Sequence, residues 1–263
     1  MRAYGVVTGI FLPMAEMTQI TAESVTPDTT SRVVLVTGGN RGIGLAIAQA
    51  FKENGDTVVV SHRSGNAPEG LHGVLMDVTD SESVASAYKE IESRFGTVDV
   101  LVANAGITKD GLSLRMSESD FQDVVNTNLT GAFRTAQKSL SGMMKKKNGR
   151  VIFIGSVVGL LGSSGQVNYA STKSGLVGMA RSFAREYGSR NITFNVIAPG
   201  FVETDMTSVL SDELREKYVS QIPLGRFCSP EEIAGVATFL ASKEAAYITG
   251  SVIPVDGGLG MGH

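Results

Sequence analysis

The stretch RVVLVTGGNRGIGLAIAQAF, residues 32–51, contains the turn on which the fold prediction rests. Its first six residues are mostly β-branched and apolar, which predicts a buried strand, and the apolar spacing after the glycines predicts a helix. Gly38, Gly42 and Gly44 lie between them, where the backbone must turn tightly and can approach a phosphate at the helix N-terminus. An ordinary glycine-rich turn is the alternative, since G-x-x-x-G-x-G is not the commoner nucleotide-binding spacing.

The same alternation of apolar runs and helical patterns continues to the end of the chain. Strands are predicted at 32–37, 57–62, 72–78, 98–104, 150–156, 192–200 and 250–256, and helices at 44–55, 80–96, 117–147 (one or two), 167–187 and 230–241. Seven apolar strands that alternate with helices predict an α/β fold, a doubly wound Rossmann-type parallel sheet with helices on both faces. In such sheets ligands bind outside the carboxyl ends of the strands.

Length and composition narrow the class of protein. The chain has 263 residues, 42% of them hydrophobic, a net charge of −3 and a single cysteine, Cys228. This composition favours one globular domain in a reducing compartment, without an intrachain disulfide, and we expect a cytoplasmic location. The charge gives no reason to expect nucleic acid or membrane binding, and no apolar run approaches the ~20 residues of a membrane helix.

The N-terminal residues do not follow the α/β pattern. Residues 1–31 combine a short apolar patch with the polar run TQITAESVTPDTTS, and Met14 or Met17 could be the natural start. A weak signal peptide is the alternative, but the patch follows one arginine and lacks a convincing cleavage site. We expect a disordered extension at 1–31 and a single domain at 32–263.

The residues after the second strand indicate which dinucleotide would bind. An NAD site would have an acidic residue there to hold the ribose 2′-hydroxyl, whereas this chain reads SHRSGN with Arg63 in that place. Arg63 and Arg41 could pair with a 2′-phosphate, to which a guanidinium is suited. Two solvated surface arginines are common, but together with the missing acid they favour NADP(H).

The segment QVNYASTKSG, residues 166–175, places Tyr169 four residues before Lys173 on a predicted helix. Alone, such a pair is more often helix decoration. Ser156 after the fifth strand and Asn128 inside a helical segment also have ordinary structural explanations. Together they could reduce a carbonyl: the tyrosine donates a proton, the lysine charge lowers its pKa, and the serine orients the oxygen.

These motifs, TGGNRGIG, NAG, Asn128, Ser156, Tyr169 with Lys173, and the Pro-Gly pair, resemble the short-chain dehydrogenase/reductase family over nearly all of residues 32–263. The resemblance implies a catalytic tetrad of Asn128, Ser156, Tyr169 and Lys173, with Asn128 supporting a water in the proton relay, and no metal. It implies NADPH/NADP as cofactor, bound by Gly38, Asn40, Arg41, Gly42, Ile43, Gly44, Arg63, Asp77, Val78, Asn104, Ala105, Gly106, Tyr169, Lys173, Pro199, Gly200, Val202 and Thr204.

Longer segments are similar to bacterial 3-oxoacyl-[acyl-carrier-protein] reductases of type II fatty-acid synthesis, among them GRVIFIGSVVGLLGSSGQVNYASTKSG and NVIAPGFVETDM. The ending VDGGLGMGH looks like the actinobacterial branch of that group. The chain departs at Ala103, where many members have asparagine, and at Ser171-Thr172, where alanine is frequent. Neither departure is expected to touch the tetrad.

The narrower resemblance implies reduction of a 3-oxoacyl chain on acyl carrier protein to the (3R)-3-hydroxyacyl product, by a homotetramer with its long helices at interfaces. Lys147 and Arg190 match the positions that dock the acidic carrier protein, although lysines at a helix C-terminus are favoured there anyway. Residues 159–166 and 207–227 are expected to shape the acyl pocket, the second as a candidate mobile lid.

Two other functions stay open. One is a reductase of the same family with another substrate, such as a 3-oxoacyl-CoA (acetoacetyl-CoA, for example), a small ketone, a sugar or a steroid. The other is a non-catalytic NADP-binding regulator on the same fold. Regulators of this kind typically lose the tyrosine and lysine, whereas this chain keeps Tyr169 and Lys173.

Overall fold

The computed structural model describes residues 31–63, 67–208 and 211–261. The extension expected at residues 1–31 lies outside the described part, apart from Ser31. Among the described residues, no helix has the length and apolar character needed to cross a membrane.

The described residues form one parallel sheet of seven strands in the order β3-β2-β1-β4-β5-β6-β7, which confirms the predicted doubly wound architecture. The strands are β1 (Val33–Val36), β2 (Thr57–His62), β3 (His72–Leu75), β4 (Val98–Ala103), β5 (Gly149–Ile154), β6 (Ile192–Pro199) and β7 (Val252–Val255). The strand order reverses between β1 and β4, which is the topological switch point where such sheets bind ligands.

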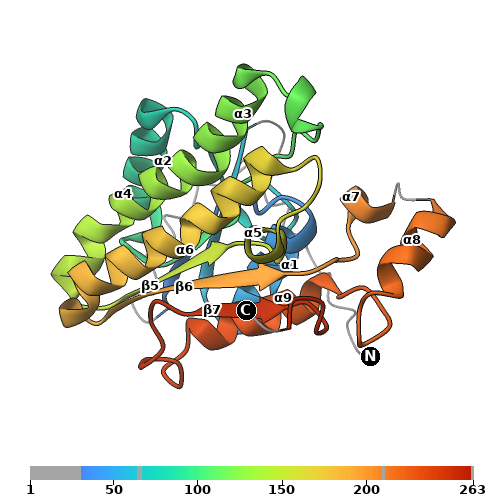
Figure 1. Cartoon of the computed structure of the whole chain (residues 1–263). Helices are drawn as coiled ribbons and strands as arrows, with labels where there is room; N and C mark the ends of the chain where they lie inside the picture. The colour runs from blue at the N-terminus through green and yellow to red at the C-terminus, as the bar shows by residue number, and fades with distance from the viewer. Residues whose placement is uncertain (1–30, 64–66, 209–210, 262–263) are drawn as a thin grey trace, which may run out of the picture.

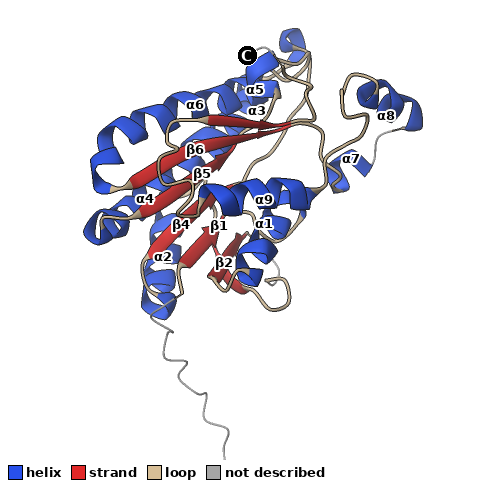
Figure 2. Ribbon diagram, turned by 90° about the horizontal axis from the view of Figure 1, so that it is seen from below, coloured by secondary structure: helices blue, strands red, loops and turns tan. Residues whose placement is uncertain are grey.

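Helices cover the sheet on both faces (Figure 2), and two apolar layers fill the space between them and the strands. One face packs against α2 (Ser81–Phe95), α4 (Gly131–Lys146) and α6 (Val167–Tyr187), and the other against α1 (Gly42–Glu53) and α9 (Pro230–Leu240). In β1, Val33 and Leu35 belong to the first layer while Val34 and Val36 belong to the second. Burial on both sides is why the strands are continuously apolar in sequence.

The third strand is shorter than the predicted 72–78. β3 ends at Leu75, and Asp77 uses its own polar groups for a turn: its carboxylate accepts from Thr79 N at 2.8 Å, and its N–H donates to Ser83 Oγ at 2.9 Å. This local bonding competes with the sheet ladder and redirects the chain into α2.

The predicted helical segment 117–147 is interrupted. α3 (Glu118–Val125) and α4 are joined by one π-helical turn, Asn126–Thr130, which contains Asn128. Ser117 caps the start of α3 by accepting from Asp120 N at 3.1 Å, and Lys147 ends α4 with a left-handed φ of 51°. π-turns of this kind are rare and often occur at functional sites.

Short elements that were not predicted from sequence lie near the carboxyl edge of the sheet. These are α5 (Val158–Leu161), α7 (Asp205–Ser208), α8 (Asp212–Val219) and the 3-10 turn Ser113–Arg115; a further 3-10 turn, Gly188–Arg190, follows α6. Figure 1 shows α7 and α8 projecting from the body of the domain, beyond the ends of the strands. They are too short to give a helical period in the sequence.

Candidate active site

The glycine-rich turn has the geometry that the sequence predicts for it. Gly38 and Gly42 have φ values of +62° and +54°, which side chains rarely adopt, and a Cβ on Gly44 would lie 2.5 Å from Asn104 Nδ2. Arg41 precedes α1 in extended conformation, and none of the described side chains caps the first turn of this helix. The turn therefore leaves backbone N–H groups and the positive end of the helix dipole available to a phosphate.

Thr37 and Asn104 tie this turn to the end of β4. The Asn104 amide donates to Thr37 O at 3.0 Å and to Gly38 O at 3.1 Å, while Asn104 N and Ala105 N both donate to Thr37 Oγ1, at 3.0 and 2.9 Å. Thr37 is buried, and its hydroxyl was not identified from the sequence. The predicted cofactor residue Asn104 thus has a structural role in holding the turn.

The residues expected around the adenine and its ribose lie at the same edge of the sheet. Arg63 directly follows β2 and is exposed, as is Arg41, while Asp77 and Val78 follow β3. Hydrogen bonds from Thr79 hold the pKa of Asp77 below its usual range, and the charge of Arg63 acts in the same direction. Arg63 therefore lies close enough to Asp77 for its charge to act on that carboxylate, beside the predicted adenine site.

The Asn128 side chain is buried, and both its oxygen and its nitrogen form hydrogen bonds. Its Oδ1 accepts from Ile107 N at 2.8 Å, and its Nδ2 donates to Ile107 O at 2.9 Å and to Thr172 Oγ1 at 3.4 Å. A Cβ on Gly106 would lie 3.2 Å from the same Oδ1. The amide therefore connects the π-turn to the loop after β4 and to α6.

This contact corrects one expectation from the sequence. Thr172 was expected not to touch the tetrad, yet it is fully buried and accepts the hydrogen bond from Asn128. The reason is helical geometry: Thr172 lies three residues after Tyr169, and its hydroxyl donates to Tyr169 O at 2.8 Å. Alanine is frequent at this position in the family, and that difference alone did not show what the Thr172 hydroxyl contacts.

Ser156, Tyr169 and Lys173 meet where β5 ends and α6 begins. Ser156 Oγ accepts from Val158 N at 3.2 Å, and Lys173 Nζ lies 5.3 Å from the centroid of the Tyr169 ring. Lys173 is only 6% exposed and donates to Ile154 O, the last residue of β5, at 2.7 Å. Together with Asn128, the four predicted catalytic residues thus lie around one end of α6.

The two titratable groups shift in directions set mainly by burial. Burial lowers the pKa of Lys173 to about 8. Burial also raises the pKa of Tyr169; an interaction with Ser156 opposes this shift and the charge of Asp110 adds to it. The net shift of the tyrosine pKa is therefore upward, because burial outweighs the interactions that lower it, and the expected net lowering is wrong. The phenol keeps its proton at neutral pH, as a proton donor must.

The sixth strand brings Pro199, Gly200, Val202 and Thr204 to the same edge. A Cβ on Gly200 would lie 2.8 Å from Asp256 Cα, and one on Gly42 would lie 3.7 Å from Thr204 Cγ2. Asp256, which the sequence did not single out, accepts from Gly258 N and Gly260 N at 2.9 and 2.8 Å. The segment after β6 therefore lies against both the glycine-rich turn and the C-terminal loop.

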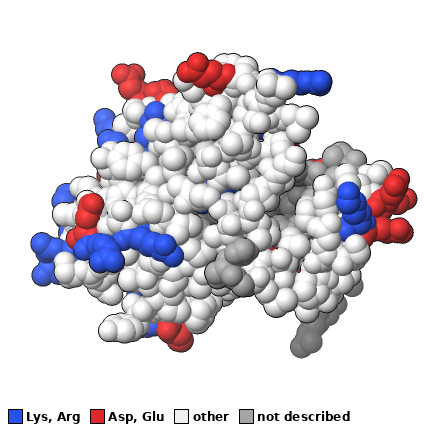
Figure 3. Space-filling view, viewed as in Figure 1, with Lys and Arg blue, Asp and Glu red and all other residues white. Residues whose placement is uncertain are grey.

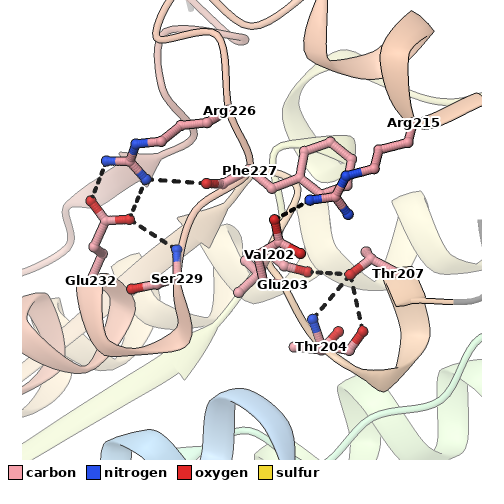
Figure 4. A network of polar contacts seen from close by, with 9 residues as sticks. All are labelled: Val202, Glu203, Thr204, Thr207, Arg215, Arg226, Phe227, Ser229 and Glu232. Carbon is pink, nitrogen blue, oxygen red and sulfur yellow. Dashed lines mark hydrogen bonds and ion pairs between the residues drawn. The ribbon is translucent and has the colours of Figure 1, made fainter. Parts of the chain in front are cut away.

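Polar and aromatic contacts anchor the segment that carries α8 (Figure 4). Arg215 on α8 pairs with Glu203, and its guanidinium lies 4.6 Å from the centroid of the Phe227 ring. Phe201 stacks on Tyr218 with ring centroids 4.4 Å apart. Arg226 pairs through both terminal nitrogens with Glu232, each at 2.7 Å. The candidate lid, of which the structure does not describe residues 209–210, is thus held by contacts to residues on both sides of it in the sequence.

Lys147 and Arg190 lie at the other edge of the sheet. Lys147 follows α4 and precedes β5, while Arg190 precedes β6, so both lie at the amino ends of the strands, and both are exposed. Figure 3 shows basic side chains gathered at this end of the molecule, over the C-terminal ends of α4 and α6. The structure does not bring them together with Tyr169 of the same chain.

Comparisons with known proteins agree with this geometry. The family model described as "Enoyl-(Acyl carrier protein) reductase" matches residues 38–260. Relatives named 3-oxoacyl-[acyl-carrier-protein] reductase MabA, from Mycobacterium bovis and Mycobacterium tuberculosis, are 53% identical over 247 residues, covering 94% of this chain and 100% of each relative. The chain belongs to the short-chain dehydrogenase/reductase family.

A relative from outside the actinobacteria agrees. The protein named 3-oxoacyl-[acyl-carrier-protein] reductase FabG from Escherichia coli is 47% identical over 238 residues, covering 88% of this chain and 98% of the relative. The family uses a nicotinamide cofactor, and the glycine-rich turn fits one because Arg41 does not cap α1 with its side chain, which leaves backbone N–H groups for a pyrophosphate.

We predict that Asn104→Ala weakens both the fold and dinucleotide binding. Two backbone oxygens, of Thr37 and Gly38, would lose their donor, which costs about 1–3 kcal/mol of unfolding free energy when such groups are buried. Urea denaturation and calorimetric titration with the dinucleotide measure both effects. Asn54→Ala, which changes an exposed amide at the end of α1, is the matched control. Equal behaviour of the two variants would contradict the role of Asn104.

We also predict that Lys173→Met does not destabilise the fold at pH 7 and raises the unfolding free energy by about 1–3 kcal/mol. The lysine pKa falls from 10.5 to about 8 on burial, so the unfolded chain binds more protons than the folded one between these values. The cost of burying the ammonium is full below pH 8 and disappears as pH rises through 10.5.

The measurement is urea denaturation of wild type and variant at pH 7 and at pH 10. The stability advantage of Lys173→Met should shrink at the higher pH, because the folded protein then buries a neutral amine and only the unfolded chain, with a lysine pKa of 10.5, still holds most of its proton. A variant that is less stable than wild type by the same amount at both pH values would show that the Lys173 hydrogen bond to Ile154 dominates.

Proposed function

We propose that this chain is an NADPH-dependent reductase that converts 3-oxoacyl thioesters on acyl carrier protein to (3R)-3-hydroxyacyl thioesters in type II fatty-acid synthesis. The observation that carries the proposal is the meeting of Tyr169, Ser156 and Lys173 at the edge of the sheet where the glycine-rich turn also lies. The names of relatives about 50% identical over nearly the whole chain support the choice of substrate.

The chemistry divides between the cofactor and the chain. When bound, the reduced nicotinamide supplies the hydride for carbon 3 of the acyl chain. Ser156 orients the ketone oxygen by a hydrogen bond, and Tyr169 donates a proton to that oxygen as negative charge develops on it. The raised pKa of Tyr169 keeps this proton in place before the reaction.

Lys173 and Asn128 position the proton donor. Lys173 is anchored to Ile154 O, and its charge near the Tyr169 ring favours the phenolate that remains after proton transfer. Asn128 holds the loop after β4 and, through Thr172, the first turns of α6. Lys173 contacts the Tyr169 ring, and Asn128 reaches Tyr169 through Thr172. These contacts support the predicted tetrad of Asn128, Ser156, Tyr169 and Lys173.

The choice of NADPH over NADH rests on charge at the end of β2. Arg63 is exposed at this position, and Arg41 precedes α1 with its side chain exposed. Two guanidinium groups favour a 2′-phosphate, which they can bind bidentately. The acid expected for a free 2′-hydroxyl is missing from the segment after β2.

The test is cofactor oxidation with acetoacetyl thioesters of acyl carrier protein and of coenzyme A, with NADPH and NADH compared. We expect turnover of the carrier-bound thioester with NADPH, and Tyr169→Phe should lower kcat by about 100-fold or more, because a general acid contributes 10²–10⁴. Tyr247→Phe, which alters a fully exposed tyrosine, is the matched control.

The outcomes separate the alternatives. Turnover of coenzyme A thioesters alone would assign another thioester substrate, and turnover of small ketones or sugars alone would assign a different reductase. NADPH binding without turnover of any ketone would fit a regulator. A Tyr169→Phe variant that keeps most activity would overturn the mechanism.

We extend the proposal to the organisation of the protein. Residues 32–263 form one reductase domain, residues 1–31 a disordered extension, and the active protein is a cytoplasmic homotetramer. Exposed apolar side chains on α4 and α6, including Phe133, Met144 and Val167, support an interface along these helices.

Carrier protein docking at Lys147 and Arg190 then requires a second subunit. Tyr169 and Arg190 lie near opposite ends of the α6 region, about 30 Å apart along the chain at the rise of an α-helix. If two subunits pair α4 and α6 in antiparallel fashion, the amino edge of one sheet lies beside the carboxyl edge of the other. A carrier bound at Lys147 and Arg190 would then serve the partner's active site.

For this patch we predict that Lys147→Glu with Arg190→Glu raises KM for the carrier-bound thioester about tenfold and leaves KM for the coenzyme A thioester nearly unchanged. The reason is loss of charge attraction to an acidic carrier, which salt also screens. Steady-state kinetics at low and high salt measure it, with Lys89→Glu, an exposed lysine on α2, as control. Equal effects on both substrates would rule out carrier docking here.

A further inference from the structure

A hollow of about 400 Å³ opens at the amino edge of the sheet, on the side of the domain opposite the catalytic residues. It lies between the starts of β1, β4, β5 and β6 and the segment that follows α9. Three basic side chains contribute to its wall, Arg32, Arg150 and Lys243, together with Asn148, Asn191 and Asp99. A volume of this size is typical of small-molecule sites.

Arg150 is the central group of this hollow. It is the second residue of β5, is only 7% exposed, and has no ion pair with any described acidic residue. Its Nη1 donates to Gly149 O at 2.8 Å, Asn191 O at 3.1 Å and Asn148 Oδ1 at 3.3 Å. Its Nε is buried without an acceptor, and among the described residues Nη2 has none either. Buried guanidinium groups are normally paired.

The other charges around the hollow do not compensate Arg150. Arg32 is paired with Asp56 at 2.8 Å. Asp99, the acid in the wall, receives Lys146 at 2.7 Å and Val33 N at 3.0 Å, so its carboxylate is already satisfied. Lys243 is exposed and forms no ion pair among the described residues, although its charge acts on the neighbouring Glu244 and, after hydrogen bonds from Ser242 and the backbone, helps to lower the pKa of that carboxyl. Two positive charges, on Arg150 and Lys243, are therefore left facing the same hollow.

Burial, with a smaller contribution from the nearby charge of Arg32, lowers the pKa of Arg150. Both effects disfavour the cation, which nonetheless stays protonated because an arginine pKa is so high. An anion placed beside Arg150 would relieve both. A phosphate group suits it, because a guanidinium donates charge-assisted hydrogen bonds to phosphate oxygens, and Nη2 is the terminal nitrogen that the bonds of Nη1 leave over.

We propose that this hollow is an anion site that binds a phosphate-type group, through the Nη2 of Arg150 and the ammonium of Lys243. The hollow is larger than a free phosphate needs, so it has room for a small molecule that bears the group. It is separate from the predicted 2′-phosphate contacts, because Arg41 and Arg63 lie at the carboxyl edge of the sheet. The site does not depend on the proposed reductase activity.

Calorimetric titration of the full chain with inorganic phosphate and with ribose 5-phosphate, at constant ionic strength set with chloride, tests the site. We expect binding of at least one ligand, and a Tm higher by about 3 °C at a tenfold excess over Kd. Tighter binding of ribose 5-phosphate would identify a carried phosphate as the occupant, and equal binding would identify the free ion.

The variants are chosen to separate this site from the rest of the protein. Lys243→Glu reverses an exposed charge at the hollow without removing a core contact, and should weaken binding about tenfold. Arg150→Lys keeps the charge but removes the Nη2 donor, and should also weaken phosphate binding. Arg63→Ala is the control for the other predicted phosphate contact and should leave one binding event intact.

Three results would overturn the proposal. The first is no binding of either ligand at millimolar concentration. The second is an unchanged phosphate affinity in Lys243→Glu. This variant changes only an exposed side chain and leaves the buried Arg150 in place, so misfolding would not explain the result. The third is loss of all phosphate binding in Arg63→Ala, which would assign the anion to the carboxyl edge.

Discussion

The hydrogen bonds between Thr37 and Asn104 hold the point where the strand order reverses. β1 and β4 lie side by side there, and the Asn104 amide and the Thr37 hydroxyl join the chain segments that leave these two strands. The shape of the glycine-rich turn, the start of α1 and the loop that Asn128 supports all depend on this link. Because parallel strands open a crevice at such a reversal, the same link fixes the place of the active site.

The active site is built at a cost to stability that is visible in Lys173. The ammonium is buried, donates one hydrogen bond, and has a pKa lowered to about 8 by burial. A core designed for stability alone would place an apolar side chain there. The same burial has the opposite effect on Tyr169: it raises the pKa of the phenol, which therefore keeps its proton. The site therefore holds an acid in its protonated form beside a cation that favours its loss.

The sequence predicted what depends on local pattern and adjacency in the sheet. The seven strands and the bounds of α6 follow from apolar periodicity, and the meeting of Asn128, Ser156, Tyr169 and Lys173 follows from the rule that parallel strands share one edge. Thr172 against Asn128, the direction of the Tyr169 pKa, and the unpaired Arg150 were not predictable. Each depends on which side chains surround a buried group, and that is decided by packing between distant segments.

The two edges of the sheet attract anions for different physical reasons. Every helix that follows a strand begins at the carboxyl edge, so backbone N–H groups and helix dipoles collect there, as at the start of α1. The same helices end at the amino edge, where cations are favoured; α1, α2, α4 and α6 each carry a lysine or arginine in the last turn. Arg150 and Lys243 add to this second surface. The polarity of a parallel sheet thus gives one chain a catalytic edge built on backbone and a basic edge built on side chains.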